Sequence, residues 1–384
     1  MRILRAQQPK PRVIYFQLNL ASGACEDYLD LLMQGLNKDA FEAAFICPEG
    51  GILDLWASRA AASGIRVARY PPNVRGLKSI MRLRSLFLEL KPDIVHFNDP
   101  CLTGVIAGRL AKVPVMVMTH HTPELNRRYN FKGSLSEKTA YRHCGLHFIF
   151  TSHFDRNTGM DNEGVPPQRA WVIPYGLPPQ RFSPIYDKKE VYAEFSIDFE
   201  CRLIANIARL SPQKGQIHLI EAAAKVIEKF KNVKFFFIGE GELDRLLKDE
   251  VRKRNLQDHF FFTGYRSDVP RLLSAMEILV MPSLFEGLCL AVIEASAMGV
   301  PVIASQVGGM RYSVLPEKTG LLVPAGDSGV LADAIIWALE HPEEARDMGL
   351  RGKKRFGELF TQETMVLNTE RLYNDLLKTQ KCRK

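Results

Sequence analysis

Short apolar runs alternate along this chain with longer segments whose apolar residues recur every three or four positions. The short runs have the length of buried strands, and they lie at residues 13–20, 41–47, 65–69, 93–97, 114–119, 147–151, 170–173, 202–208, 233–238, 260–262, 278–281, 300–304 and 320–323. The longer segments have the periodicity of amphipathic helices, as at residues 26–36, 77–90, 102–111, 216–230, 243–254, 287–298 and 330–339. Strands that are apolar on both faces and alternate with helices predict an α/β fold with doubly wound parallel sheets.

A stretch of turn-forming residues, IPYGLPP at residues 173–179, interrupts this alternation. Proline cannot continue a helix, so we expect a domain boundary here. The prediction is one Rossmann-like domain at residues 1–177 and a second at residues 178–360, because 384 residues exceed one ordinary domain. The helical pattern from about residue 361 to 384 either closes the second domain or packs back on the first. Ligands of such sheets bind beyond the carboxyl ends of the strands, so two facing domains would form a deep central cleft.

Positive charge is concentrated in the first half of the chain. The net charge is +8, and residues 1–178 hold 22 lysines and arginines against 15 acidic residues. Residues 59–84 contain no acid and seven basic side chains, which are Arg59, Arg66, Arg69, Arg75, Lys78, Arg82 and Arg84. This basic stripe suits an anionic membrane surface or a phosphorylated acceptor, although such runs are often only solvated charge.

No part of the sequence approaches the roughly 20 consecutive apolar residues that span a bilayer. The apolar run at residues 13–20 follows a basic N-terminus, but it contains Gln17 and Asn19, and we interpret it as a first strand and not as a signal peptide. The seven cysteines form no C-x-x-C pair, which favours buried thiols over disulfides or zinc. We therefore expect a cytoplasmic protein. It could also act at the inner face of a membrane.

The strongest chemical signal is FEGLCL at residues 285–290, after the strand at 278–281. Gly287 permits close backbone approach, and the amides from Gly287 and Leu288 onward would open a helix and attract an anion. Glu294 follows Glu286 by eight residues, a little over two turns of about 3.6 residues, so both carboxylates would lie on related faces of one helix. Such acids suit ribose or sugar hydroxyl groups. On spacing alone, two solvated glutamates fit equally well.

Two cations follow the strand at residues 202–208. Arg209 ends the strand, and Lys214 comes after a turn that contains proline. Fixed cations at the carboxyl edge of a sheet can hold a diphosphate and neutralise it as it departs. Ordinary surface charge is the alternative for this pair.

Glycine-bearing turns follow several strands of the second half. They contain Gly239 and Glu240, Gly264 and Tyr265, and Gly308 and Gly309. Each can be only a turn, but their common position at one edge of one sheet favours a ligand site.

Adjacent histidines, His120 and His121, end the strand at residues 114–119. Neighbouring residues of a strand point to opposite faces, so at most one of the two faces a ligand. No third ligand is spaced to complete a metal site, and a structural histidine is an equally good interpretation. The sequence also lacks the phosphate-loop, nucleophile-elbow and nucleic-acid-binding motifs, so we expect no nucleic-acid partner.

Taken together, these motifs resemble the retaining glycosyltransferases of family 4 (glycosyl transferases group 1), which have the GT-B fold. The resemblance is tight from about residue 171 to 323 and loose before that. It rests on VIPYG at residues 172–176, on Arg209 with Lys214, and above all on two glutamates separated by seven residues.

The resemblance implies a nucleotide-sugar donor, with UDP-sugar favoured over GDP-sugar. It implies a glycan or lipid-linked acceptor in the synthesis of cell-surface polysaccharide or glycolipid. Arg209 and Lys214 would bind the donor diphosphate, Glu294 would hold the ribose, and Glu286 would touch the donor sugar. Members generally need no metal, because the cations take its place, so no cofactor is expected.

The resemblance also places a histidine of a T-x-H-T sequence beside the transferred sugar, which is His121 here, with His120 as the fallback. Two departures occur. Gly23 stands alone near the donor phosphate or the acceptor, where members have two glycines, and Tyr175 replaces a familiar asparagine at the boundary.

Two other functions fit the same architecture. One is a sugar phosphorylase or a nucleotide-sugar epimerase, and the other is a non-catalytic regulatory protein that binds a nucleotide sugar. The presence of two acids and two cations at the matching positions argues against the regulatory protein, since a binder need not keep all four. The oligomeric state is left open by the sequence.

Overall fold

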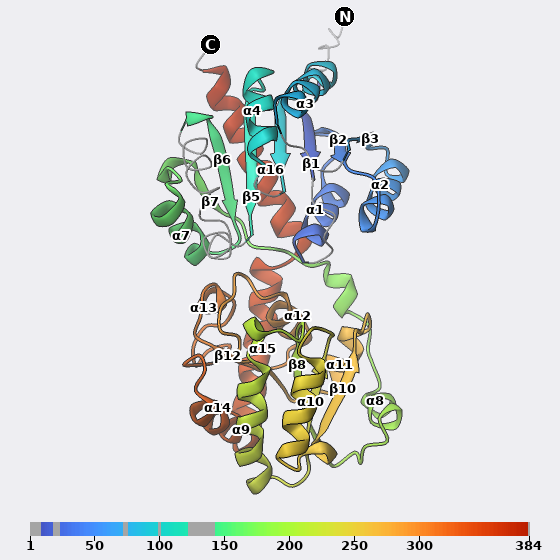
Figure 1. Cartoon of the computed structure of the whole chain (residues 1–384), viewed down its shortest axis with the longest axis vertical. Helices are drawn as coiled ribbons and strands as arrows, with labels where there is room; N and C mark the ends of the chain where they lie inside the picture. Colours follow the sequence, from blue (N-terminus) through green and yellow to red (C-terminus); the bar gives the residue numbers. More distant parts are fainter. Residues whose placement is uncertain (1–8, 18–23, 72–75, 99–100, 122–142, 383–384) are drawn as a thin grey trace, which may run out of the picture. The chain divides into compact units, whose positions relative to one another are not determined.

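The computed structural model describes residues 9–17, 24–71, 76–98, 101–121 and 143–382. The chain forms two compact units, shown in Figure 1, and the first unit contains both ends of the chain. It comprises Met1–Gly176 with Gln362–Lys384, and the second unit comprises Leu177–Thr361. Each unit contains one parallel sheet, which confirms the α/β class with two Rossmann-like sheets.

The sheet of the first unit has seven parallel strands in the order β3-β2-β1-β4-β5-β6-β7. They are β1 (Arg12–Phe16), β2 (Glu42–Cys47), β3 (Arg66–Arg69), β4 (Ile94–Phe97), β5 (Val115–His120), β6 (Leu146–Phe150) and β7 (Ala170–Val172). The order reverses between β1 and β4, and a crevice for ligands forms at such a switch point in open sheets.

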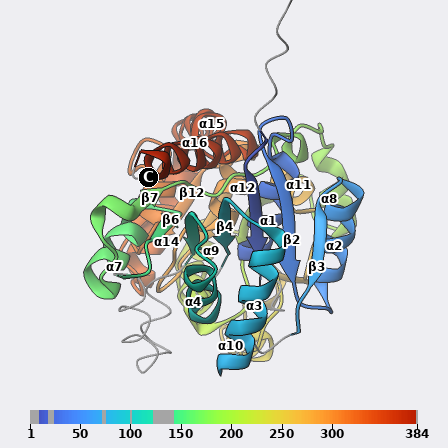
Figure 2. The same cartoon turned by 90° about the horizontal axis from the view of Figure 1, so that it is seen from above.

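Helices cover both faces of this sheet. They are α1 (Ala24–Gly35), α2 (Ile52–Ala62), α3 (Gly76–Leu90), α4 (Leu102–Leu110), α7 (His153–Glu163) and α16 (Gln362–Lys381). Figure 2 shows α16 on one side of the strands and α3 and α4 on the other. Helix α16 packs against α1, where Gln362 Nε2 donates to the Leu31 carbonyl at 2.8 Å. Gly35 permits this approach, since a Cβ there would lie 2.6 Å from a methyl of Val366.

A buried polar network joins α16 to this sheet. His96 of β4 contacts the Tyr373 hydroxyl through Nδ1 and the Thr119 hydroxyl through Nε2, the latter at 2.6 Å. The Thr119 hydroxyl donates in turn to Tyr28 of α1 at 3.3 Å. All four side chains are fully buried. Because a buried polar group is costly unless it is hydrogen-bonded, this network specifies where α16 lies on the sheet.

The sheet of the second unit has six parallel strands in the order β10-β9-β8-β11-β12-β13. They are β8 (Arg202–Ile207), β9 (Val233–Ile238), β10 (Phe260–Gly264), β11 (Ile278–Met281), β12 (Val302–Ser305) and β13 (Gly320–Val323). Its switch point lies between β8 and β11, so the loops that follow these two strands are placed for ligand binding.

The second unit has an apolar core on each face of its sheet. Its helices and 3₁₀ turns are η2 (Pro179–Phe182), α8 (Lys188–Glu194), η3 (Pro212–Lys214), α9 (Gln216–Lys229), α10 (Asp244–Lys253), η4 (Gln257–His259), α11 (Val269–Ala275), α12 (Leu290–Met298), α13 (Met310–Ser313), α14 (Ser328–Glu340) and α15 (Pro342–Leu359). Helices α9, α10 and α14 supply one core, and α8, α11 and α12 supply the other. Gly349 lets α15 cross close to α12, since a Cβ there would lie 2.2 Å from the Gly299 carbonyl oxygen.

The buried His96 of the first unit should make the free energy of unfolding depend on pH. Burial, and after it the charge of His121, lowers the pKa of His96 to about 3. The unfolded chain takes up a proton near pH 6.5 where the folded chain does not, so the free energy of unfolding falls as the pH drops below that value. In His96→Gln we expect this fall to be smaller by up to about 1.4 kcal/mol per pH unit, measured by urea unfolding at pH 7, 6 and 5.

The matched control is His341→Gln, which replaces an exposed histidine of the second unit and leaves the buried His96 in place; its fall should stay larger than that of His96→Gln. Equal slopes for His96→Gln and the unsubstituted chain would contradict the prediction.

Candidate functional site

Glu286 lies in the loop between β11 and α12 and is buried, with 8% of its surface exposed. The Ser283 hydroxyl donates to its Oε1 at 3.0 Å, and the Lys214 ammonium contacts the same oxygen. Helix α12 begins only at Leu290, with Cys289 at its cap. The expected helix start at Gly287 is therefore wrong, and Glu286 and Glu294 do not share one helix.

Backbone contacts with a neighbouring loop explain why the helix starts late. The Gly309 amide donates to the Glu286 carbonyl at 3.2 Å. A Cβ at Gly308 would lie 1.8 Å from that carbonyl oxygen, and a Cβ at Gly309 would lie 2.5 Å from the Gly287 carbonyl oxygen. The Glu286 carbonyl therefore accepts its bond from the loop after β12, and Gly287 lies against the same loop.

The opposite side of the Glu286 loop rests on the turn that contains Lys214. The Leu284 amide donates to the Gln213 carbonyl at 2.8 Å, and Gln213 Nε2 donates to the Phe285 carbonyl at 3.0 Å. Gly215 has a φ of +65°, and a Cβ there would lie 2.2 Å from the Pro282 carbonyl oxygen. Two loops thus hold Glu286 between them at the carboxyl edge of the sheet.

Opposing effects set the charge of Lys214. Burial is the largest effect and lowers its pKa, but the charges of Glu286 and Cys289 and the bond to Glu286 together raise it. The net pKa lies above the ordinary lysine value, so the side chain is an ammonium at neutral pH. The structure therefore places a half-buried ammonium beside a buried acid.

Arg209 follows β8 and is exposed. Its carbonyl accepts a bond from Gln216 Nε2 at 3.0 Å, which fixes the backbone at the start of α9. Its charge lowers the pKa of Lys214, which places the two cations in each other's field. The Arg209 guanidinium makes no ion pair with any residue that the structure describes, so its charge is available to an anion.

The glycine turns after β9 and β10 pack on the loop after β8. Gly239 has a φ of +140°, and a Cβ there would lie 2.1 Å from the Ala208 carbonyl oxygen. The Tyr265 amide donates to Glu240 Oε1 at 3.3 Å, so the Glu240 carboxylate ties its turn to the next one beyond Gly264. The Tyr265 side chain is 74% exposed. The turn after β9 therefore packs on the loop that contains Arg209, and Glu240 links it to the turn after β10.

Glu294 lies inside α12, where 9% of its surface is exposed. Its Oε1 is 3.0 Å from Nη2 of Arg181, which belongs to the 3₁₀ turn η2. No role is predicted for Arg181 from the sequence. The pairing depends on tertiary structure, because more than a hundred residues separate the two partners.

His120 and His121 have different partners in the first unit. His120 ends β5, lies 2.9 Å from Glu163 through Nε2 and stacks on Phe150. His121 Nε2 lies 3.2 Å from Asn98 Oδ1. The two rings therefore occupy different environments, as the alternation of strand residues predicts.

Burial keeps His121 neutral, because desolvation and then the charge of His120 lower its pKa to about 3. Tyr28 lies edge-on to the His121 ring at 5.2 Å and also contacts Tyr175 at 5.7 Å. Gly23, which the sequence places near the donor, lies outside the described residues. No group of three or more potential metal-ligating side chains occurs among the residues that the structure describes.

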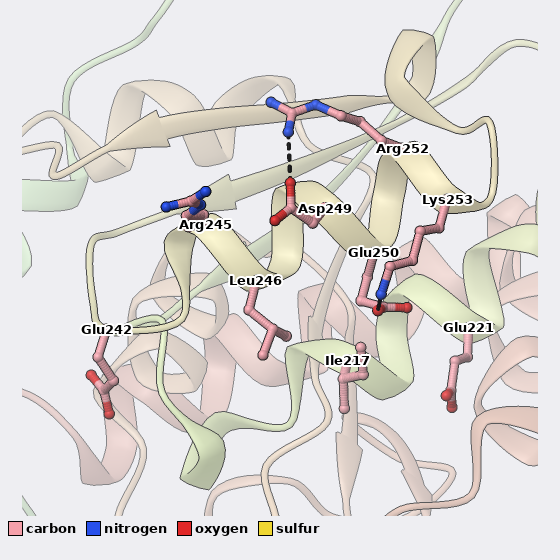
Figure 3. Close-up of a pocket in the computed structure, with 9 residues that line it drawn as sticks. All are labelled: Ile217, Glu221, Glu242, Arg245, Leu246, Asp249, Glu250, Arg252 and Lys253. Atoms are coloured by element: carbon pink, nitrogen blue, oxygen red, sulfur yellow. Dashed lines mark hydrogen bonds and ion pairs between the residues drawn. The ribbon is translucent and has the colours of Figure 1, made fainter.

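A pocket of about 900 Å³ lies between α9 and α10 (Figure 3). It is lined by Ile217, Glu221, Glu242, Arg245, Leu246, Asp249, Glu250, Arg252 and Lys253. Dashed lines in Figure 3 mark the Arg252–Asp249 and Lys253–Glu250 pairs. None of the predicted site residues lines this pocket, so volume alone does not locate the chemistry.

Two family models together cover most of the chain. Residues 25–181 match the family described as Glycosyltransferase Family 4, and residues 187–355 match the family described as Glycosyl transferases group 1. Among the described residues, no helix is both long and apolar enough to cross a bilayer.

Individual proteins agree with these matches. The chain is 28% identical to UDP-Gal:alpha-D-GlcNAc-diphosphoundecaprenol alpha-1,3-galactosyltransferase of Escherichia coli, over 78% of this chain and 81% of the relative. It is 25% identical to a GDP-mannose-dependent alpha-(1-6)-phosphatidylinositol monomannoside mannosyltransferase of Mycolicibacterium smegmatis, over 86% and 89%.

The fold also matches a solved structure, Anabaena HepE in complex with UDP. The TM-score is 0.81 at 18% identity, and the match covers 95% of this chain and 100% of that one. The loops around Glu286, Lys214 and Arg209 occupy the carboxyl edge of a sheet of this fold. The chain therefore belongs to the GT-B glycosyltransferases, with a family 4 N-terminal part and a group 1 C-terminal part, and it is a transferase.

Proposed function

We propose that this enzyme is a retaining glycosyltransferase that moves a hexose-type sugar from a nucleotide-sugar donor to a hydroxyl group of a glycan or lipid-linked acceptor. The observation that carries the proposal is the pair of half-buried Lys214 and buried Glu286, with Arg209 beside it, at the carboxyl edge of the second sheet. A diphosphate is bound by fixed cations, and sugar hydroxyl groups are bound by a carboxylate that accepts their hydrogen bonds. The pair and Arg209 supply both within one site.

The donor diphosphate binds Arg209 and Lys214 in this proposal, and amides from Gly287 and Leu288 onward add donors. Glu286, released in part from Lys214 by the incoming phosphate, accepts bonds from the sugar hydroxyl groups. Glu294 holds the ribose. No metal is required, because two cations face the two phosphates.

Transfer breaks the bond between the anomeric carbon and the phosphate oxygen through an oxocarbenium-like state. Arg209 and Lys214 stabilise the departing nucleoside diphosphate. The acceptor hydroxyl attacks the face that the phosphate vacates, and a phosphate oxygen takes the acceptor proton. The anomeric configuration is thereby retained. His121, neutral and buried, lies beside the transferred sugar, with His120 as the fallback.

The relatives support a choice of donor and acceptor. The Escherichia coli relative is named for UDP-galactose and a diphosphoundecaprenol-linked acceptor, and the Mycolicibacterium relative is named for GDP-mannose and a phosphatidylinositol mannoside. We favour a UDP-sugar, with a GDP-sugar as the alternative, and an acceptor of cell-surface polysaccharide or glycolipid synthesis. Such acceptors place a cytoplasmic enzyme at the inner face of a membrane.

The outer face of α3 suits such a surface. Leu77, Met81 and Leu88 are 73%, 46% and 44% exposed. At about 100° per residue they fall within one sector of the helix, with Arg84 at one edge and Lys78 at the other. An apolar stripe flanked by bases is typical of helices that lie in a membrane interface.

The structure divides the basic stripe into two groups. Arg59, Arg66 and Arg69 pair with Asp30, Glu89 and Asp54. Lys78, Arg82 and Arg84 make no ion pair with the residues that the structure describes, and Arg75 lies outside them. Among the described bases of the stripe, those without an ion pair therefore all belong to α3.

The function is tested by a thermal-shift series with UDP-, GDP- and ADP-sugars in the presence of EDTA. A donor at 100 times its Kd stabilises the fold by about 2.7 kcal/mol. No shift with any donor would favour the non-catalytic regulator, and turnover that depends on free phosphate would favour a phosphorylase.

Loss of the exposed cation should slow the chemistry. We expect Arg209→Ala to lower kcat by about 10²–10³-fold, because one preformed electrostatic contact to the leaving group is lost. The measurement is nucleoside diphosphate release from the donor that the thermal-shift series identifies. Arg245→Ala, which removes another exposed arginine of the same unit, is the control and should keep full turnover. Turnover within twofold in Arg209→Ala would disprove this mechanism.

A methyl group at the Glu286 loop should abolish donor binding without unfolding the chain. Gly308→Ala places a Cβ against the Glu286 carbonyl oxygen at a φ of +46°, so the loop must move. We expect the thermal shift with donor to disappear while the fold persists. Gly357→Ala in α15 meets nothing within 4 Å and should leave donor binding intact. An unchanged shift in Gly308→Ala would mean that this loop does not hold the donor.

Replacing the bases of α3 that make no ion pair should release the enzyme from anionic vesicles. The triple variant Lys78→Gln, Arg82→Gln, Arg84→Gln should bind phosphatidylglycerol vesicles about 100-fold more weakly, at about 1 kcal/mol per base. The control is Arg59→Gln, Arg66→Gln, Arg69→Gln, which removes the same net charge from paired positions. If both triple variants lose the same vesicle affinity, the binding depends on net charge alone and α3 is not the docking face.

A further inference from the structure

Glu294 is an acid inside an apolar helix. Every residue of α12 from Ala291 to Ala297 is buried. A charged carboxylate in such a place is destabilising unless a counter-charge and hydrogen bonds compensate for the lost water. The position therefore needs a partner that keeps the acid ionised.

Arg181 is such a partner. Its Nη2 lies 3.0 Å from Glu294 Oε1, and the Glu294 side chain is only 11% exposed against 40% for Arg181. A bond between two ionised groups is roughly twice as strong as a neutral one. The pair lies wholly within the second unit.

The backbone and neighbouring rings hold Arg181 in place. The Arg181 amide donates to the Pro178 carbonyl at 3.1 Å in the turn η2. Its guanidinium lies over the Phe182 ring at 5.7 Å from the centroid, and Phe182 packs edge-on against Phe356 of α15 at 5.7 Å. The guanidinium is therefore presented to Glu294 from a fixed turn.

We infer that Arg181 is a positioning residue of the donor site, which holds the Glu294 carboxylate ionised and oriented so that it accepts the ribose hydroxyl groups of the nucleotide. The inference rests on the proposed donor role of Glu294. Arg181 acts through Glu294 and does not touch the diphosphate. A residue that bonds to a ligand-binding group from outside the site commonly fixes the rotamer and the charge of that group.

The test compares two ligands, UDP and 2′,3′-dideoxy-UDP, by calorimetry. GDP and its dideoxy analogue replace them if the thermal-shift series selects guanosine. In the unsubstituted enzyme, UDP should bind about 10- to 100-fold more tightly than the dideoxy analogue, because two hydroxyl bonds to a charged acid are present. Glu294→Gln should weaken UDP binding and reduce this preference severalfold.

Arg181→Gln should weaken UDP binding about tenfold and leave the affinity for the dideoxy analogue unchanged. The double variant should bind UDP no more weakly than Glu294→Gln alone, since the two residues act on one interaction. Arg181→Lys keeps the charge and should recover part of the loss. Arg245→Gln should change neither affinity.

Two results overturn the inference separately from the proposed function. Equal weakening of both ligands in Arg181→Gln, or additive losses in the double variant, would mean that Arg181 only supports the local fold. An unchanged UDP affinity in Glu294→Gln would disprove the ribose role of Glu294, and the role of Arg181 with it.

Discussion

The site in the second unit depends on backbone loops that approach too closely for any side chain to lie between them. The Glu286 carbonyl accepts a bond from Gly309, and the chain at Gly215 lies against the Pro282 carbonyl. These contacts fix the Glu286 loop from two sides. Because close-packed backbone deforms little, Glu286 is held before any ligand arrives.

Within this frame, each buried acid is paired with a base. Lys214 meets Glu286, and Arg181 meets Glu294, while Arg209 is the exposed cation next to them. Pairing offsets the desolvation penalty of these buried carboxylates while no ligand is bound. A donor that brings its own negative charge would compete with Glu286 for Lys214 and would free that acid for sugar hydroxyl groups.

The first unit includes helix α16, which comes from the C-terminal end of the chain. His96, Thr119 and Tyr28 form a buried polar network with Tyr373 of α16. The same region buries His121 beside Tyr28. Tyr28 thus belongs to the network that holds α16 and also packs against His121, the histidine proposed to face the sugar.

The sequence by itself determined the thirteen strands of the described residues, their two parallel sheets and the placement of Arg209, Lys214 and Glu286 in loops that follow strands, because strand periodicity and turn residues are local signals. It misplaced the start of α12 by taking FEGL as helix, because Gly308 and Gly309, which contact the carbonyls of this segment, belong to the distant loop after β12. It missed α15, whose Gly349 weakens the helical pattern but permits the crossing with α12. It also assigned no role to Arg181 and left α16 between two units. Only the tertiary structure decided these points, since ion pairs, close backbone contacts and buried networks join residues that no spacing along the chain relates.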